Sequence, residues 1–275
     1  MTRTGDVGAY YDLLTPLLQQ LWGGNFHIGL WPDRATPSED ADREGRLAET
    51  DTASDRLTDL LVEELALAPG QRLLDVGCGV GRPALRLARS TGARVTGITI
   101  SSSQVRLATD HARAAGLDRL VGFQLADAAA LPLPDGSYDA AWAIESLLHI
   151  PDTRRALTEI HRVLAPGGPF VISDMILRAP DPEPHAHSSV EPLETLLSLL
   201  EETGFEVTGH TGLDDHLLRS LQRLSTDLEH HRKHLADADG PATDALARIL
   251  GKTIPAVGTV YGYTVITTSA TRTTR

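Results

Sequence analysis

The sequence predicts an α/β fold built on a mostly parallel sheet, and three features indicate it. An apolar run at 73–76 leads into alternating glycines, which is typical of a buried strand that ends in a tight turn before a helix. Further short apolar runs bounded by turn residues follow at 93–101, 121–128, 140–145 and 169–174. Finally, Pro166-Gly167-Gly168 ends a helical stretch and turns the chain back into the last of these runs.

The glycine turn reads G-x-G-x-G at 77–81, with Asp75 two positions before its first glycine. A turn of this kind at the start of a helix lets a nucleotide or nucleoside approach the main chain closely. A dinucleotide-binding fold would show G-x-G-x-x-G and an acid at the end of the next strand. Here Thr99, Ser101 and Gln104 occupy the region where that acid is expected.

These residues resemble the class I S-adenosylmethionine (AdoMet) methyltransferases. The stretch 97–104, G-I-T-I-S-S-S-Q, is similar to a variant found in small-molecule methyltransferases and cyclopropane synthases. The phrases L-P-L-P-D-G-S-Y-D at 131–139 and H-R-V-L-A-P-G-G at 161–168 are similar to the family in the same order, so the resemblance covers about 70–175. It implies a Rossmann-like seven-stranded methyltransferase sheet with helices on both faces.

The resemblance also implies the cofactor, AdoMet or its product S-adenosyl-L-homocysteine (SAH), and the residues expected to contact it. These residues are Tyr11, Asp75, Gly77, Cys78, Gly79, Gly81, Thr99, Ile100, Gln104, Asp127, Ala128 and Glu145. Structural interpretations stand beside some of these roles. Ser101 also suits the N-cap of the following helix, an isolated Asp127 after a strand suits a turn, and Cys78 suits a small packing residue.

The chain outside this core is expected to form a lid and a cap. Residues 7–31 resemble the lid of AdoMet-dependent tailoring enzymes, which folds over the cofactor. The polar stretch 32–52 predicts a surface loop, and leucines at stripe spacing predict a helical insert over 214–251 before a closing strand at 260–266. We therefore expect three regions. They are an N-terminal lid and linker (1–52), the AdoMet-binding core (53–177) and a substrate cap plus the closing strands (178–275).

The segment after the fourth strand, E-S-L-L-H-I-P-D at 145–152, is where the resemblance bears on catalysis. Sugar O-methyltransferases of natural-product pathways commonly have E-S-L-H-H-M-P-D, so Leu148 stands where they carry the first histidine. His149 and Asp174 are retained and are the expected catalytic residues. The resemblance, however, implies that the first histidine position is the likelier base, and that the residue at the position of His149 is a cofactor-side contact in many relatives. Trp31, His27, Leu148 and Met175 are expected to contact the substrate. Alternative bases are Asp174 itself, His27, His185 and His187.

Three functions remain open at this stage. The main interpretation is methyl transfer to a small hydrophobic natural product, a polyketide, macrolide or glycoside, in secondary metabolism such as antibiotic biosynthesis. An amine or activated carbon acceptor would need no strong base. Because Leu148 replaces a histidine, a methyltransferase-fold cyclase that binds AdoMet or SAH but cyclises a polyketide is the alternative. A nonenzymatic AdoMet-binding protein is the third.

The formal net charge of −12 over 275 residues disfavours nucleic acid and anionic membranes as partners. The sequence shows neither an apolar run that spans a bilayer nor a signal peptide, so a cytoplasmic monomer or homodimer is expected. No metal site is expected. His230 and His234 lie one helical turn apart, but no further ligand is spaced to complete a zinc site.

Overall fold

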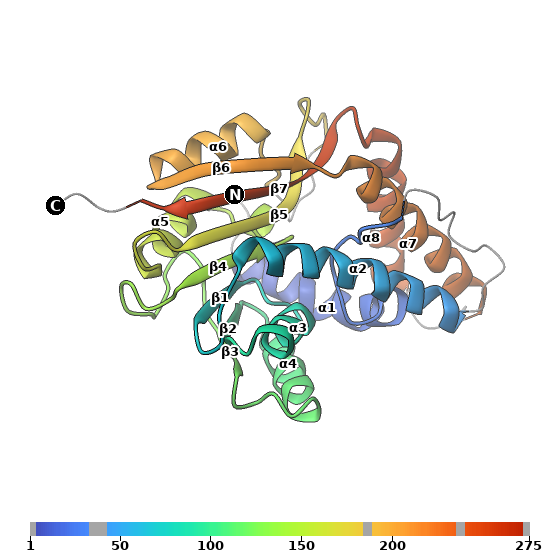
Figure 1. Ribbon diagram of the computed structural model, residues 1–275. Coiled ribbons are helices and arrows are strands. Elements are labelled where there is room, and N and C mark those ends of the chain that lie inside the picture. Colours follow the sequence, from blue (N-terminus) through green and yellow to red (C-terminus); the bar gives the residue numbers. More distant parts are fainter. Residues whose placement is uncertain (1–3, 33–42, 184–188, 235–239, 272–275) are drawn as a thin grey trace.

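One seven-stranded sheet organises the part of the chain that the computed structural model describes, residues 4–32, 43–183, 189–234 and 240–271 (Figure 1). The strand order is β3-β2-β1-β4-β5-β7-β6. Neighbouring strands from β3 to β5 run parallel, and β7 is antiparallel to both β5 and β6. This confirms the predicted seven-stranded methyltransferase sheet. The strands are β1 (Arg72–Val76), β2 (Arg94–Thr99), β3 (Val121–Leu125), β4 (Ala140–Ile144), β5 (Pro169–Leu177), β6 (Phe205–Gly212) and β7 (Tyr261–Ala270).

Helices cover both faces of the sheet because the side chains of each central strand point alternately to the two sides. Leu73 of β1 joins a cluster with helices α2, α3 and α7, whereas Leu74 joins a second cluster with α5 and α6. The helices are α1 (Thr4–Trp22), α2 (Arg43–Leu65), α3 (Arg82–Thr91), α4 (Ser102–Ala114), α5 (Thr153–Val163), α6 (Leu193–Glu202), α7 (Asp214–His234) and α8 (Gly240–Thr253), with short 3-10 turns η1 (Leu147–His149) and η2 (Ile254–Ala256).

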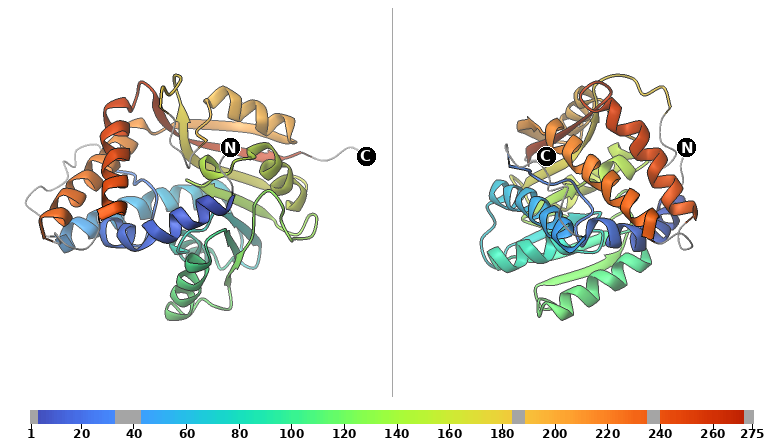
Figure 2. Two further views of the ribbon diagram at one scale, coloured as in Figure 1. Left: turned by 180° about the vertical axis from the view of Figure 1, so that it is seen from behind. Right: turned by 90° about the vertical axis from the view of Figure 1, so that its right-hand side faces the viewer.

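The predicted cap is present and lies beyond the carboxyl ends of the parallel strands. Helices α7 and α8 are inserted between β6 and β7, and Figures 1 and 2 show them gathered with α1 at that end of the sheet. Leucines of α1 and α7 belong to the same buried cluster, which joins the lid helix to the cap. Ligands of open α/β sheets bind at this end, so the cap covers the expected site.

The expectation of a surface loop over 32–52 was wrong for its second half, because helix α2 already begins at Arg43. The charges that make this stretch look like a loop have partners on other elements. Arg46 is buried and pairs with Asp227 of α7 at 2.6 Å, and Asp51 pairs with Arg82 of α3 at 3.0 Å. The expected boundary between residues 52 and 53 therefore falls inside α2.

Among the described helices, none is long and apolar enough to cross a membrane. The described residues likewise contain no group of three or more His, Cys, Asp or Glu side chains that could hold a metal ion. The side chain of His234 lies outside the described part of the chain.

Candidate active site

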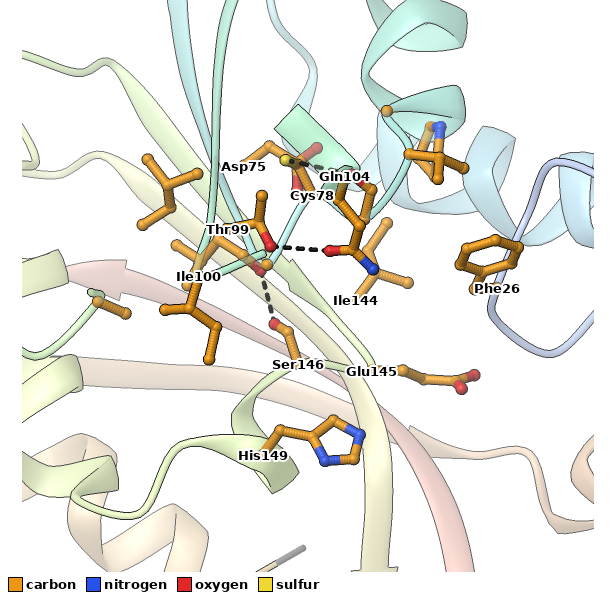
Figure 3. A pocket seen from close by; sticks show the side chains of 18 of the residues that line it. Phe26, Asp75, Cys78, Thr99, Ile100, Gln104, Ile144, Glu145, Ser146 and His149 are labelled. Carbon is orange, nitrogen blue, oxygen red and sulfur yellow. Dashed lines mark hydrogen bonds between the residues drawn. The ribbon is translucent and has the colours of Figure 1, made fainter. Parts of the chain in front are cut away.

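A pocket opens at the carboxyl ends of β1, β2, β3 and β4, where the glycine turn and the lid segment meet (Figure 3). It brings together most of the residues that the sequence predicted for the cofactor. Those that line it are Asp75, Gly77, Cys78, Gly79, Gly81, Thr99, Ile100, Gln104, Asp127, Ala128 and Glu145. Two of the other predicted site residues, His27 and His149, line the same pocket. The side chain of Tyr11 lies outside the described part of the chain.

The glycine turn presents main chain to the pocket. The backbone N–H groups of Gly77 and Cys78 both donate to the Ile98 carbonyl at 2.9 Å, which folds the turn back over β2. Gly77 adopts φ +77°, and a Cβ there would lie 2.3 Å from the Ser146 Cβ. A Cβ on Gly79 would instead have Phe26 as its only neighbour within 4 Å, at 3.9 Å. The first glycine is therefore required by the fold, and the second leaves open space for a ligand.

Asp75 has one buried carboxyl oxygen, Oδ2, that is available as an acceptor, although the Trp142 indole N–H acts on the same carboxyl and partly offsets the effect of burial on its pKa. Its side chain is 2% exposed, and burial raises its pKa to about 7. Its Oδ2 atom has no hydrogen-bond partner among the described residues. Buried carboxylate oxygens are rarely left without a donor, so this atom fits a ligand that brings one. The hydroxyls or ammonium group of AdoMet or SAH have that chemistry.

Thr99 and Gln104 lie together at the pocket wall, as expected. The Thr99 hydroxyl donates to Gln104 Oε1 at 2.8 Å (Figure 3). Ser101 is the N-cap of α4, because its hydroxyl accepts from the Gln104 backbone N–H at 3.1 Å. Asp127 follows β3 in a loop, where its Oδ1 accepts from the Ala129 N–H at 2.9 Å. The structural interpretations of Ser101 and Asp127 are thus confirmed, while both Asp127 and Gln104 still face the pocket.

Cys78 is the single cysteine, and its surroundings make it unreactive. The thiol is buried, and this burial together with the nearby Asp75 carboxyl raises its pKa well above the usual range. A thiol with a raised pKa supplies almost no thiolate. The interpretation of Cys78 as a small packing residue is confirmed.

Glu145 links the lid to the sheet. Its Oε1 accepts from the Ile28 backbone N–H at 2.7 Å and from the Tyr263 hydroxyl of β7 at 3.0 Å. Its backbone has φ +46°, a strained conformation for a residue with a side chain. Burial, with a smaller effect from the Asp174 carboxyl, raises the pKa of Glu145 to about 8.

Glu145→Gln is expected to flatten the pH dependence of stability. In the unfolded chain the carboxyl ionises near its ordinary pKa of 4.5, whereas in the folded protein it holds its proton to about pH 8. The folded protein binds more protons between these values, so its stability falls as pH rises through that window. Gln keeps the acceptor oxygen for Ile28 and Tyr263 but cannot ionise. Urea unfolding across this window should show the variant gaining stability relative to wild type; parallel pH curves would contradict this assignment.

The two residues of the expected catalytic pair, His149 and Asp174, do not line the same pocket. His149 lines the pocket on the same wall as Ser146 and Glu145 (Figure 3). Asp174 does not line it. The Asp174 carboxylate accepts from the backbone N–H of Leu148 at 3.2 Å and of Met175 at 2.8 Å, and burial raises its pKa to about 7. Asp174 therefore supports the turn that carries His149.

The predicted substrate contacts Leu148 and Met175 also lie away from the main pocket. With Asp174 they line a separate small cavity behind η1, which also includes Leu147, Thr153, Ser189, Glu191 and Leu196. The 3-10 turn sends the adjacent side chains of Leu148 and His149 in different directions, a result that sequence order does not predict. In this structure Leu148 and Met175 do not form a wall of the main pocket.

His27 of the lid lines the pocket as a neutral imidazole. Its Nδ1 lies 2.8 Å from the Ile28 carbonyl, which can only accept, so Nδ1 carries the proton. Burial lowers the pKa of His27 to about 4. This imidazole is a weak base at neutral pH. The alternative bases His185 and His187 lie outside the described residues.

Trp31 differs from the expectation that it lies against cofactor or substrate. It is 5% exposed and does not line the pocket. Its indole N–H donates to the Ser220 hydroxyl of α7 at 2.8 Å, and the Gly29 backbone N–H donates to the same oxygen at 3.0 Å. Trp31 therefore fastens the lid segment to the cap.

Ser220→Ala is expected to lower the free energy of unfolding by about 2 kcal/mol, because it leaves two buried N–H groups of the lid without an acceptor. Ser225→Ala on the same helix, at a half-buried position, is the control and should change stability by less than about 0.5 kcal/mol. Chemical denaturation measures both. Equal effects would show that the Ser220 hydroxyl does not hold the lid.

Sequence reasoning did not predict several residues that line the pocket, among them Phe26 and Ser146. Phe26 lines the pocket from the lid, and Ser146 lines it from the end of β4. The Ser146 hydroxyl donates to the Val76 carbonyl at 2.6 Å, next to the glycine turn. Phe26 lies inside the lid motif that the sequence did single out, so the motif as a whole was the available signal.

Comparison with known proteins shows the family. Residues 74–172 match the family model described as a methyltransferase domain. Methyltransferase GfsG of Streptomyces halstedii is 44% identical over 63% of this chain, and the match spans 59% of that protein. The 27-O-demethylrifamycin SV methyltransferase of Amycolatopsis mediterranei is 40% identical over 77% of this chain and 70% of that protein.

A solved structure covers nearly the whole fold. The [4+2]-cyclase SpnF is 36% identical, with a TM-score of 0.85 over 98% of this chain and 97% of that chain. Its similarity extends over the lid and the cap as well as the core. The glycine turn, the buried Oδ2 oxygen of Asp75 and these relatives lead to one conclusion. The chain belongs to the class I AdoMet-dependent methyltransferases, in the branch that contains natural-product O-methyltransferases.

Proposed function

We propose that the pocket binds AdoMet, with the cofactor roles expected from the sequence. Asp75 Oδ2 supplies an acceptor, the glycine turn gives close contact with main chain, and Asp127 lines the pocket after β3. Thr99 and Gln104 form a bonded pair on the wall between them. When bound, AdoMet supplies a methyl group that its sulfonium has already made electrophilic.

We further propose that the enzyme methylates a hydroxyl of a small hydrophobic natural product, a polyketide, macrolide or glycoside. One observation carries this proposal. The Asp75 Oδ2 acceptor and the His149 side chain share one pocket, and apolar side chains surround them. Ile144, Ile150 and Phe26 contribute the apolar lining. The relative that acts on demethylrifamycin SV supports an acceptor of this size and polarity.

The protein's own groups then align the acceptor and remove its proton. Alignment of two reactants inside an enclosed site supplies roughly 7–11 kcal/mol of barrier reduction. His149 takes the hydroxyl proton, since it lines the pocket and His27 is too weak a base. Asp174 holds the turn that carries His149, and Glu145 holds the lid closed over the site.

We also propose the three-region organisation described above, with α2 shared by the lid and the core. A monomer or homodimer working in the cytoplasm suits a single buried cysteine and an acidic surface. Size-exclusion chromatography with light scattering tests the oligomeric state.

A second candidate is cyclisation of a polyketide without methyl transfer. Two observations favour it. The likeness to the [4+2]-cyclase SpnF extends over almost the whole chain. In addition, Leu148 lies outside the pocket and the Asp174 carboxylate is occupied by backbone N–H groups, so His149 is the only member of the expected catalytic pair that reaches the cavity.

Incubation with methyl-labelled AdoMet and either hydroxylated macrolactones or linear polyketides, followed by mass spectrometry, separates the two functions. A product heavier by one labelled methyl group, with an equal amount of SAH, supports methyl transfer. Conversion of a linear polyketide to an isomer of unchanged mass, without SAH, would overturn methyl transfer and support cyclisation. Protein without a functional glycine turn (Gly79→Ala) is the control for cofactor dependence.

A further inference from the structure

The lid helix α1 docks on the segment 99–104, which runs from the end of β2 into the first turn of α4 and carries two pocket residues, Ile100 and Gln104. Three residues of α1 at helical spacing make this contact. A Cβ on Gly8 would lie 2.9 Å from the Ile100 carbonyl oxygen, which shows how closely the backbones approach. Asp12 and Thr15 lie on the same face, one and two turns further along.

Asp12 provides the charged contact on this face. Its Oδ1 accepts from the Ser101 hydroxyl at 2.5 Å and also from the Ser103 hydroxyl. These hydrogen bonds lower the pKa of Asp12 below its ordinary value. The carboxylate also lies at the N-terminus of α4, where the helix dipole favours a negative charge.

The contact continues into the pocket wall. Ser101 is the N-cap that holds the Gln104 backbone, and Gln104 Nε2 donates to the Thr15 hydroxyl at 3.4 Å. The other end of the Gln104 amide accepts from Thr99 at 2.8 Å. A chain of hydrogen bonds therefore runs from the lid helix through Ser101 and Gln104 to Thr99.

We propose that Asp12 is a positioning residue that holds the 99–104 segment in the geometry that binds the cofactor. This inference rests on the proposed AdoMet site. With α1 docked, Ile100 and Gln104 are ordered before the ligand arrives. Without the Asp12 contact, the ligand must order both the 99–104 segment and the lid helix. The free-energy cost of that ordering makes its binding weaker.

Calorimetric titration with AdoMet and with SAH tests the proposal. Asp12→Asn removes the charge and keeps the shape, and it is expected to weaken binding of both ligands about tenfold, as for loss of a charge-assisted hydrogen bond. Gly8→Ala should also weaken the contact between α1 and the 99–104 segment, because the added methyl group would press against the Ile100 carbonyl oxygen. Because alanine raises helix propensity, this variant should bind more weakly although its helix is intrinsically more stable. Weaker binding in Asp12→Asn with an unchanged free energy of unfolding is the result that a merely structural role would not give.

Matched variants distinguish the possible outcomes. Asp110→Asn, an exposed acid on α4 that pairs with Arg113, should bind like wild type. Ser103→Ala should weaken binding less in the Asp12→Asn background than alone, because the two share one interaction. If wild type binds neither AdoMet nor SAH, the proposed function fails. If wild type binds and Asp12→Asn binds equally well, or loses only stability, the positioning role of Asp12 is overturned while the function stands.

Discussion

Gly79→Ala is expected to weaken AdoMet and SAH binding by about 100-fold while costing only about 1–2 kcal/mol of stability. At Gly79 the protein leaves open space, with Phe26 at 3.9 Å as the only neighbour of an added Cβ, so the methyl group would occupy room that the ligand needs. The stability cost comes from the left-handed backbone, φ +51°. Calorimetric titration gives the affinity, and urea unfolding gives the stability.

Substitutions at two other glycines distinguish the effect of the left-handed backbone from the effect of the space that an added Cβ occupies. Gly70 has φ +84° and nothing within 4 Å of an added Cβ, so Gly70→Ala reports the left-handed backbone alone and should leave binding intact. Gly77 has a similar φ, +77°, but its Cβ would collide with Ser146 at 2.3 Å. Gly77→Ala should therefore lose about 2–4 kcal/mol of stability, from backbone strain plus overpacking. Unchanged cofactor affinity in Gly79→Ala would place the ligand elsewhere.

His149→Ala is expected to reduce the rate of methyl transfer by about 10²–10⁴-fold, the usual contribution of a general base. The affinity for AdoMet should change little, because the acceptor oxygen of Asp75 and the glycine turn remain. Single-turnover kinetics with labelled AdoMet measures the rate, and titration measures the affinity.

His27→Gln is the matched control, since His27 lines the same pocket but is already neutral with a pKa of about 4. Its effect on the rate should be small, whereas His149→Ala should lower the rate by about 10²–10⁴-fold. A cyclisation directed by cavity shape would survive His149→Ala nearly unchanged, and that result would overturn the assignment of His149 as the base.

The sequence by itself determined the sheet and the glycine turn. Strand β1 and the turn at 77–81 follow from local residues, because an apolar run buries on both faces and glycines adopt left-handed conformations that other residues avoid. The N-cap at Ser101 follows in the same way. The resemblance to the methyltransferase family, and not the local pattern, predicted Thr99 and Gln104 as cofactor residues, and the structure shows that both line the pocket.

Only the tertiary structure decided which partner each buried polar group meets. The ion pair of Arg46 with Asp227 joins residues 181 positions apart, and the Trp31 indole finds Ser220 at a separation of 189. Without knowledge of these partners, the sequence predicts a loop for the stretch 43–52 and a substrate contact for Trp31. Hydrophobic spacing says which face of a helix is buried, but it does not say which distant side chain will face it.

The catalytic wall shows the same division most clearly. Sequence similarity predicted Leu148, His149 and Asp174 as residues of one site. In the structure His149 lines the main pocket, whereas Leu148 and Asp174 line the separate small cavity. The Asp174 carboxylate accepts a hydrogen bond from the Leu148 backbone N–H of the turn η1, because a buried backbone N–H needs an acceptor. The family resemblance of the sequence thus named the residues of the site, whereas packing fixed their division between the pocket and its support.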